Sequence, residues 1–287
     1  MDDHTHFHNH SSSQIDTHAH PHEAYRSRRD FLRVLINGTL AGASILELAY
    51  HRAAWARAAP VSHSKLFDIE KAAEGIYFAQ ARPQAMINCN ASIFVGAKEV
   101  VVVDAHSKPS AATSLIGQIK REITEKPVRY VINTHFHWDH TQGNHAYRAA
   151  EQKVDFIAST TTKQLMADLA VARMNASVEQ VPDEVEKLRA RAAQAASEAE
   201  KTFCANQIRQ LRAYQSELKN YSLELPTITF EKSYVLRDPA HDLHLEFHGH
   251  AHTAGDVVVF CPQRRVIATG DMIHGFLPFI ADGYPRT

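Results

Sequence analysis

The residues best suited to chemistry lie in one short stretch, residues 131–145, which reads V-I-N-T-H-F-H-W-D-H-T-Q-G-N-H. Four potential metal ligands fall within six residues of it: His135, His137, Asp139 and His140. Imidazole and carboxylate together suit zinc, with iron or manganese as rivals. Alternate side chains of an extended backbone point to the same side, so the first two histidines are expected to share one ion. A turn after them would direct the other two ligands elsewhere, toward a second ion.

This pattern resembles the H-x-H-x-D-H motif of the metallo-β-lactamase superfamily, and the resemblance extends from about residue 67 to the end of the chain. Residues 249–256, G-H-A-H-T-A-G-D, are similar to the family's third metal motif, which selects His252 as the ligand. His248 and His250 compete with it, because all three share one face of an extended chain. Asp271, in a T-G-D at a strand end, matches the family's bridging aspartate.

The resemblance implies two ion positions. The expected ligands of the first ion are His135, His137 and His252, and those of the second are Asp139 and His140, with Asp271 between the metals. An open coordination position at the first ion is typical of catalytic rather than structural zinc. A bound water whose pKa falls to about 7 would attack a carbonyl carbon. Asp139 would orient that water and carry its proton to the leaving group.

Two further residues flank the predicted site, and one expected part is absent. Asp104 follows the apolar run 100–103 and is expected to brace the site without binding metal, whereas His106 is expected to lie on a surface loop. The family supplies another histidine to the second ion from well beyond T-G-D. Only sixteen residues follow Asp271, and His274 is too close to serve. We therefore expect a C-terminally incomplete sequence whose second site is short of ligands.

Three functions stay open at this point. The first is a zinc-dependent hydrolase of a small amide, lactam, ester or thioester, which needs no protein nucleophile, and the sequence has no G-x-S-x-G motif. The second is a mononuclear iron dioxygenase of sulfur compounds that uses His135, His252 and Asp271. The third is a non-catalytic metal-binding protein or an inactive fragment. One fold serves many substrates and does not choose among them.

Helix and strand patterns alternate along the chain, which favours a layered α/β fold. Strands are expected at 100–103, 128–133 and 154–158, and a helix at 109–122 capped by Ser107 or Ser110. The resemblance implies a four-layer αβ/βα sandwich with an incomplete second half. Neither Gly nor Pro interrupts residues 183–225, and one helix of that length would span about 65 Å. We therefore expect an insertion of two helices at about 183–221, with the break near 203–206.

Composition excludes some partners. The 287 residues are 44% hydrophobic with a net charge of −1, so neither nucleic acid nor an anionic membrane is indicated as a partner. The three cysteines, Cys89, Cys204 and Cys261, have no C-x-x-C spacing and are expected to be small buried hydrophobic residues.

The N-terminal part reads as a separate leader. Residues 1–25 contain seven histidines and are expected to be a solvated tail. Arg28-Arg29-Asp30-Phe31-Leu32, a mildly apolar stretch and Ala56-Arg57-Ala58 then follow in the order of a twin-arginine export signal. The stretch is too polar and too short for a stable membrane span. We expect residues 1–58 to be removed by the export machinery, which leaves a periplasmic or secreted domain of residues 59–287.

Overall fold

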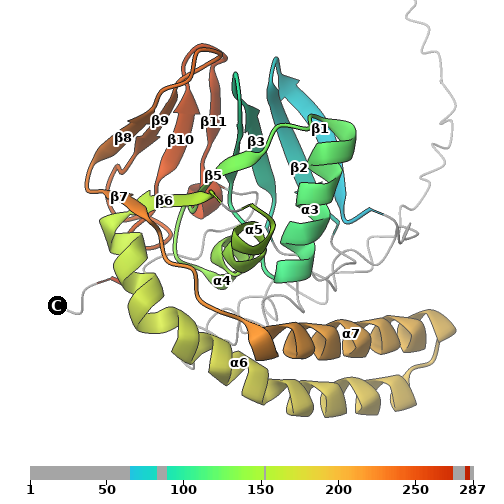
Figure 1. The fold of residues 1–287 in the computed structure, drawn as a ribbon. Helices are drawn as coiled ribbons and strands as arrows, with labels where there is room; N and C mark the ends of the chain where they lie inside the picture. Colours follow the sequence, from blue (N-terminus) through green and yellow to red (C-terminus); the bar gives the residue numbers. More distant parts are fainter. Residues whose placement is uncertain (1–64, 83–88, 152, 274–281, 285–287) are drawn as a thin grey trace, which may run out of the picture. The chain divides into compact units, whose positions relative to one another are not determined.

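The computed structural model describes residues 65–82, 89–151, 153–273 and 282–284. Two β-sheets form its framework (Figure 1): seven strands in the order β1-β2-β3-β4-β5-β6-β7, and four in the order β11-β10-β9-β8. The predicted leader at 1–58 and His274 lie outside the described residues.

The strands bring together two motifs from distant parts of the chain, H-x-H-x-D-H at residues 135–140 and G-H-A-H-T-A-G-D at residues 249–256. The larger sheet contains β1 (Phe67–Ala73), β2 (Ile76–Ala81), β3 (Ala91–Val95), β4 (Val100–Val103), β5 (Val128–Ile132), β6 (Asp155–Ser159) and β7 (Ile228–Phe230). The smaller contains β8 (Ser233–Leu236), β9 (Leu243–Glu246), β10 (Val258–Cys261) and β11 (Val266–Ala268). Strands β4 to β7 pair in parallel, so their carboxyl ends share one edge, where ligand sites collect in such sheets.

Within the described residues, five α-helices and two short 3-10 helices accompany the sheets. They are α3 (Pro109–Glu122), α4 (Trp138–Thr141), α5 (Asn144–Ala150), α6 (Thr160–Gln194), α7 (Glu198–Glu217), η2 (Leu218–Asn220) and η3 (Gly270–Met272). The bounds predicted for α3 are confirmed, but the predicted serine cap is wrong. Lys108 is the N-cap and makes no side-chain cap bond, whereas the Ser110 hydroxyl donates to Glu217 instead, at 2.8 Å.

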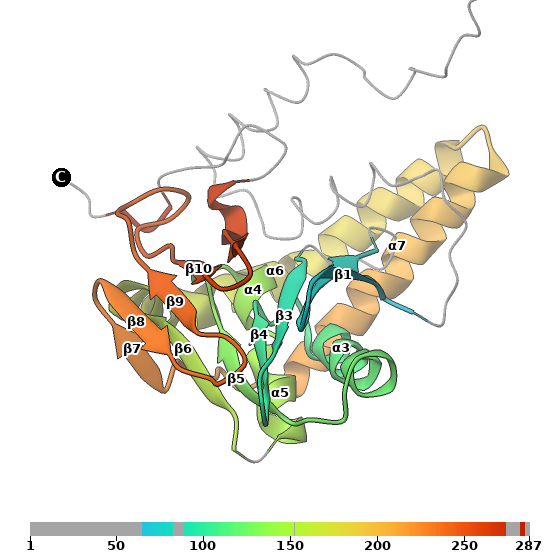
Figure 2. The same cartoon turned by 90° about the horizontal axis from the view of Figure 1, so that it is seen from above.

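Two hydrophobic cores lie on opposite faces of the seven-stranded sheet. One packs α3 and α5 against it, through residues such as Leu115, Tyr147 and Phe156. The other fills the space between the sheets, where Ile132 and Ile157 meet side chains of the four-stranded sheet. In the part of the chain that the structure describes, no α-helix covers the outer face of that smaller sheet (Figures 1 and 2). The mixed α/β class is therefore confirmed, with three of the four expected layers present.

The predicted pair of helices is present, but its predicted bounds are wrong. The first helix, α6, begins at Thr160 and runs through Pro182, and the turn falls at 195–197 rather than 203–206. Pro182 has no N–H for the carbonyl of Val178, and the Gln215 side chain of α7 donates to that carbonyl at 3.3 Å. The proline is therefore tolerated because the neighbouring helix replaces the missing hydrogen bond.

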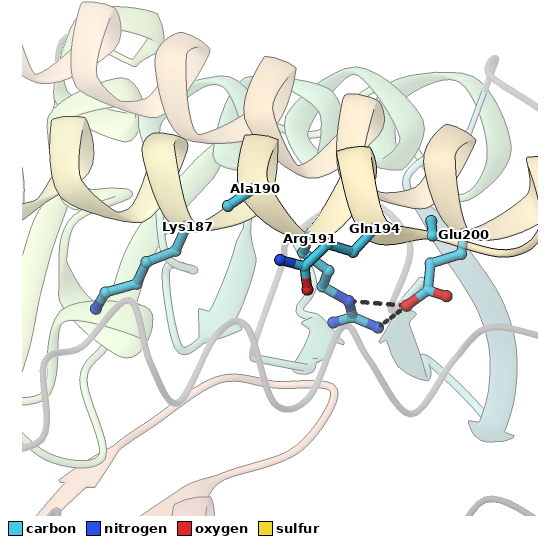
Figure 3. A pocket seen from close by; sticks show the side chains of 6 residues that line it. Lys187, Ala190, Arg191, Gln194 and Glu200 are labelled. Carbon is cyan, nitrogen blue, oxygen red and sulfur yellow. Dashed lines mark hydrogen bonds and ion pairs between the residues drawn. The ribbon is translucent and has the colours of Figure 1, made fainter.

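The turn between α6 and α7 is fixed by polar side chains. Ser197 caps α7 by accepting a hydrogen bond from the backbone N–H of Glu200 at 3.2 Å. Arg191 of α6 donates two hydrogen bonds to the Glu200 carboxylate, at 3.0 and 2.8 Å (Figure 3). The hollow beside this pair contains none of the predicted metal ligands.

The base of this helical pair contacts the segment that follows β5 and contains the H-x-H-x-D-H motif, residues 135–140, which we call the metal-motif loop. Trp138 is buried in a cluster with side chains of α6 and α7, and its ring centroid lies 5.8 Å from that of Tyr214. The Tyr214 hydroxyl donates to Gln142 at 2.8 Å. Trp138 therefore packs beneath the insertion. None of the described helices is both long enough and apolar enough to cross a membrane.

Candidate metal centre

Three predicted histidines converge at the carboxyl edge of the large sheet. His135 and His137 follow β5, and His252 precedes β10. One nitrogen of each of the three rings lies within 4.8 Å of the others. His137 Nδ1 and His252 Nε2 are 3.0 Å apart. Residues separated by more than a hundred positions thus form one group of potential ligands.

Hydrogen bonds on the side of each ring that faces away from the cluster assign the tautomers of His135 and His137. The Thr134 hydroxyl donates to Asp104 at 3.0 Å, so it accepts from His135 Nδ1, also at 3.0 Å. His137 Nε2 donates to the carboxylate of Asp282 at 2.8 Å. The remaining nitrogens, His135 Nε2 and His137 Nδ1, therefore carry lone pairs that face the interior of the cluster.

These lone pairs fit a bound cation. His135 Nε2 is fully buried and has no hydrogen-bond partner among the residues that the structure describes, and such an atom costs free energy unless something binds it. Two nitrogens bound to one tetrahedral zinc at about 2.0–2.1 Å would lie about 3.3 Å apart. The 3.0 Å separation of His137 Nδ1 and His252 Nε2 is close to that value. Imidazole nitrogens are ligands that suit zinc, copper, iron and nickel, so the donor set fits a transition-metal ion.

A second group adjoins the first and shares His135 with it. His140 Nε2 lies 3.5 Å from Asp271 Oδ1, and one ligand atom from each of His135, His140 and Asp271 falls within 4.8 Å of the others. Asp271 Oδ2 is also 3.8 Å from His252 Nε2, so this carboxylate lies between the two groups. Asp139 Oδ2 is 3.7 Å from His140 Nε2, but Asp139 belongs to neither group.

Burial and charge set the protonation of these residues. Burial, aided by the neighbouring histidines, holds the pKa of His135 well below its ordinary value, so the ring is neutral. Burial opposes protonation of His140, but the surrounding carboxylates outweigh it and raise its pKa. Burial likewise opposes ionisation of Asp271, yet His140 and the other histidines lower its pKa. A cation binding at this second group would displace a proton from His140.

Asp104 connects the two strand ends behind the site. Its carboxylate accepts from the backbone N–H of Thr134 at 2.9 Å and lies 2.9 Å from His140 Nδ1. The contact between Asp104 and His140 Nδ1 turns the opposite nitrogen of the ring, Nε2, toward Asp271. The backbone of Asp104 has φ 68°, a left-handed conformation that Asp adopts more readily than most residues. Asp104 also belongs, with Cys89 and His140, to a third group of potential ligand atoms within 4.8 Å of one another, so its expected role as a brace stays a prediction.

The structure distinguishes His252 from its two competitors. His248 and His250 are exposed, and His248 contacts Glu246 at 3.1 Å. Within the third motif, Asp256 accepts from the backbone N–H of Thr253 at 2.6 Å and from its hydroxyl at 2.9 Å. The T-x-G-D residues therefore shape the loop that turns His252 inward.

Two glycines of the motifs are required by close packing. A Cβ at Gly143 would lie 1.6 Å from the carbonyl oxygen of Ala105, and one at Gly255 would lie 2.8 Å from the backbone nitrogen of Thr162. The first position seats the metal-motif helices against the end of β4. The second seats the third motif against the beginning of α6.

Two residues near the site differ from expectation. His106 is fully buried, not on a surface loop: its Nδ1 lies 3.0 Å from the carbonyl oxygen of Cys89, and burial lowers its pKa to about 3. All three cysteines are buried as expected. Cys89, however, places its sulfur 3.6 Å from His140 Nδ1, and burial raises the pKa of this thiol to about 12.

Asp282 and Arg173 also adjoin the site, and sequence reasoning missed both. Asp282 accepts from His137 and from Arg173 of α6, the latter at 2.6 and 2.9 Å. Burial opposes ionisation of Asp282, but these hydrogen bonds outweigh it and hold its pKa well below the usual range. Neither residue lies in a motif of recognisable spacing, so no sequence signal could have found them.

Comparison with known proteins identifies the class. A family model described as the metallo-beta-lactamase superfamily matches residues 86–285. The match covers more than half of the chain, so the chain belongs to this superfamily.

Two solved structures are similar to this chain at low sequence identity. One is a metallo-beta-lactamase from Pontibacter korlensis, at 17% identity and a TM-score of 0.45, with 69% of this chain and 67% of that chain covered. Another is a metallo beta lactamase from Hirschia baltica, at 14% identity and a TM-score of 0.44, with 71% of this chain and 70% of that chain covered.

Proposed function

We propose that this protein is a zinc-dependent hydrolase of a small amide, lactam, ester or thioester. One observation carries the proposal: inward-facing imidazole nitrogens of His135 and His137 lie within 4.8 Å of a nitrogen of His252, beside the carboxylate of Asp271. Three histidine ligands with space for one more are typical of catalytic zinc. Membership in the superfamily agrees with this chemistry.

The chain offers ligands for one or two ions. His135 Nε2, His137 Nδ1 and His252 Nε2 would hold the first, whereas His140 Nε2, Asp271 and Asp139 would hold the second. Bound zinc would supply a water of lowered pKa and a positive charge for the oxygen of the carbonyl group. The histidines orient the ions, and their own outer hydrogen bonds keep the rings in place.

Asp139 is the residue of the chain that we assign to proton transfer. It lies at the start of α4 with its carboxylate 3.7 Å from His140 Nε2. An ionised carboxylate at this place would accept the proton of the attacking water and return it to the leaving group. Asp104 contributes indirectly, because it holds the His140 ring.

A second candidate function rests on the group that combines histidines with a carboxylate. The sequence predicted His135, His252 and Asp271 as the ligands of a mononuclear iron. The converging set of two histidines and one carboxylate is instead His135, His140 and Asp271, a ligand combination that non-haem iron oxygenases use as well. This observation keeps the iron-dependent dioxygenase of sulfur compounds as the alternative.

Metal analysis of the purified protein separates the two candidates. We expect one or two equivalents of zinc, loss of hydrolysis after chelation, and recovery on adding zinc, tested with chromogenic lactam, ester and thioester substrates. Iron at one equivalent with oxygen uptake would instead support the dioxygenase. Bound zinc without turnover of any substrate class would indicate a metal-binding protein.

We also propose that the chain is exported through the twin-arginine route. The support is the order of Arg28-Arg29, the apolar stretch and Ala56-Arg57-Ala58. N-terminal sequencing of protein from the periplasmic fraction should find a chain that begins near Ala59. Replacing both arginines with lysine should retain the longer chain in the cytoplasm. An unprocessed cytoplasmic wild type would contradict the proposal.

A further inference from the structure

A short C-terminal segment lies directly against the third metal motif. We call residues 282–284 the strap. Asp282 pairs with Thr253 as an isolated β-bridge, and its carbonyl oxygen accepts from the N–H of Ala254 at 3.2 Å. The Tyr284 hydroxyl donates to the carbonyl oxygen of Ala251 at 2.8 Å. The strap thus follows the loop that contains His252.

The other side of the strap faces the helical insertion. Gly283, at φ 72°, packs so closely that an added Cβ would lie 2.9 Å from Leu165 of α6 and 3.3 Å from the ring of Phe136. The Arg173 guanidinium lies over that same ring, 5.0 Å from its centroid. The strap is therefore enclosed between α6 and the metal-motif loop, which restricts the positions open to Asp282.

The Asp282 carboxylate joins these elements to one metal-site histidine. Its Oδ2 accepts from His137 Nε2 at 2.8 Å and from Arg173 at 2.6 Å, while its Oδ1 accepts from Arg173 at 2.9 Å. A bidentate guanidinium fixes the plane of a carboxylate. The side chain of Asp282 is only 20% exposed, so water competes weakly for these hydrogen bonds.

We propose that Asp282 and Arg173 are positioning residues that set the tautomer and orientation of His137, so that its Nδ1 lone pair faces the first ion. The inference rests on the proposed metal site. A carboxylate behind a metal-bound histidine keeps the proton on the outer nitrogen and increases the basicity of the inner one. The helical insertion therefore contributes to metal affinity through a single arginine.

The test is the zinc affinity of full-length protein and its variants, measured by competition with a chromogenic chelator. Asp282→Ala should weaken the tighter zinc site by about 10- to 100-fold. Asp282→Asn should give an intermediate loss, because the amide oxygen still accepts from His137 but has no charge. Arg173→Gln should fall between Asp282→Asn and wild type. The cobalt(II) spectrum of Asp282→Ala should also differ from that of wild type.

Two control variants separate positioning from simple packing. Arg191→Gln removes an arginine of the same helix that also binds a carboxylate and lies over a phenylalanine ring, away from the site. Tyr284→Phe removes the hydrogen bond from the Tyr284 hydroxyl to Ala251 and keeps Asp282. Both should bind zinc as wild type does.

The outcomes distinguish this inference from the proposed function. Wild-type affinity in both Asp282 variants would overturn the positioning role while leaving the metal site intact. A loss in Tyr284→Phe as large as that in Asp282→Ala would overturn it as well, since packing of the strap would then explain the effect. A wild type that binds no zinc would instead contradict the proposed function. If Asp282→Ala fails to fold, the nearly isosteric Asp282→Asn decides.

Discussion

Replacing His252 with alanine is expected to remove the tightly bound zinc and to reduce kcat/KM by about a thousandfold or more. His252 is the ligand that joins the second half of the chain to His135 and His137, with Nε2 3.0 Å from His137 Nδ1. Loss of the ion removes several kcal/mol of charge stabilisation, and each 1.36 kcal/mol is a factor of ten in rate. Zinc content and steady-state kinetics are the two measurements.

His248→Ala is the matched control for this prediction. It removes a histidine from the same loop, but an exposed one that contacts Glu246 and lies outside the ligand groups. Zinc content and kinetics should remain those of wild type. If the His252 variant kept both its zinc and its activity, the three-histidine site would be wrong, whatever the fold.

Replacing Asp139 with asparagine is expected to lower kcat by about 10²- to 10⁴-fold, the range associated with loss of a proton-transfer group. The first ion should remain, because its proposed ligands are His135, His137 and His252, whereas the second ion, of which Asp139 is a proposed ligand, should bind more weakly. Asparagine keeps the size of the side chain but does not accept a proton at neutral pH. Kinetics and zinc content of the same preparation therefore separate loss of turnover from loss of metal.

Asp168→Asn serves as the control, because Asp168 contacts only Gln164 of its own helix among the hydrogen bonds found for it. Loss of one zinc equivalent in Asp139→Asn would show that Asp139 is a ligand of the second ion. Unchanged kcat with unchanged zinc would remove Asp139 from the mechanism. A wild type without turnover of any lactam, ester or thioester substrate would contradict the proposed hydrolase and leave the dioxygenase or metal binding as the function.

Local pattern was sufficient for much of this molecule. Helix 109–122 follows from Pro109 and the spacing of Leu115, Ile116 and Ile119, whose burial needs only a sheet to pack against. The H-x-H-x-D-H spacing placed two histidines on one side of a strand end without knowledge of the rest. These features are determined by neighbours in sequence, which is why a sequence shows them.

The local sequence pattern was misleading where a residue's hydrogen bonds or packing contacts come from residues far away in sequence. Pro182 signals a helix boundary, yet α6 continues because Gln215 bonds the carbonyl that the proline leaves free. His106 has the surroundings of an exposed loop in sequence, but in the fold it is buried against Phe67, with ring centroids 4.6 Å apart. Neither partner is near in sequence, so neither effect was visible.

The sequence by itself determined the class of the protein and a candidate set of metal ligands, because ligand type and short spacing can be read along the chain. Only the tertiary structure decided which of three equally spaced histidines turns inward, and that Asp282 and Arg173 support His137 from behind. Those outcomes depend on hydrogen bonds between segments that meet only after folding. The spacing of residues in the sequence carries no information about these long-range hydrogen bonds.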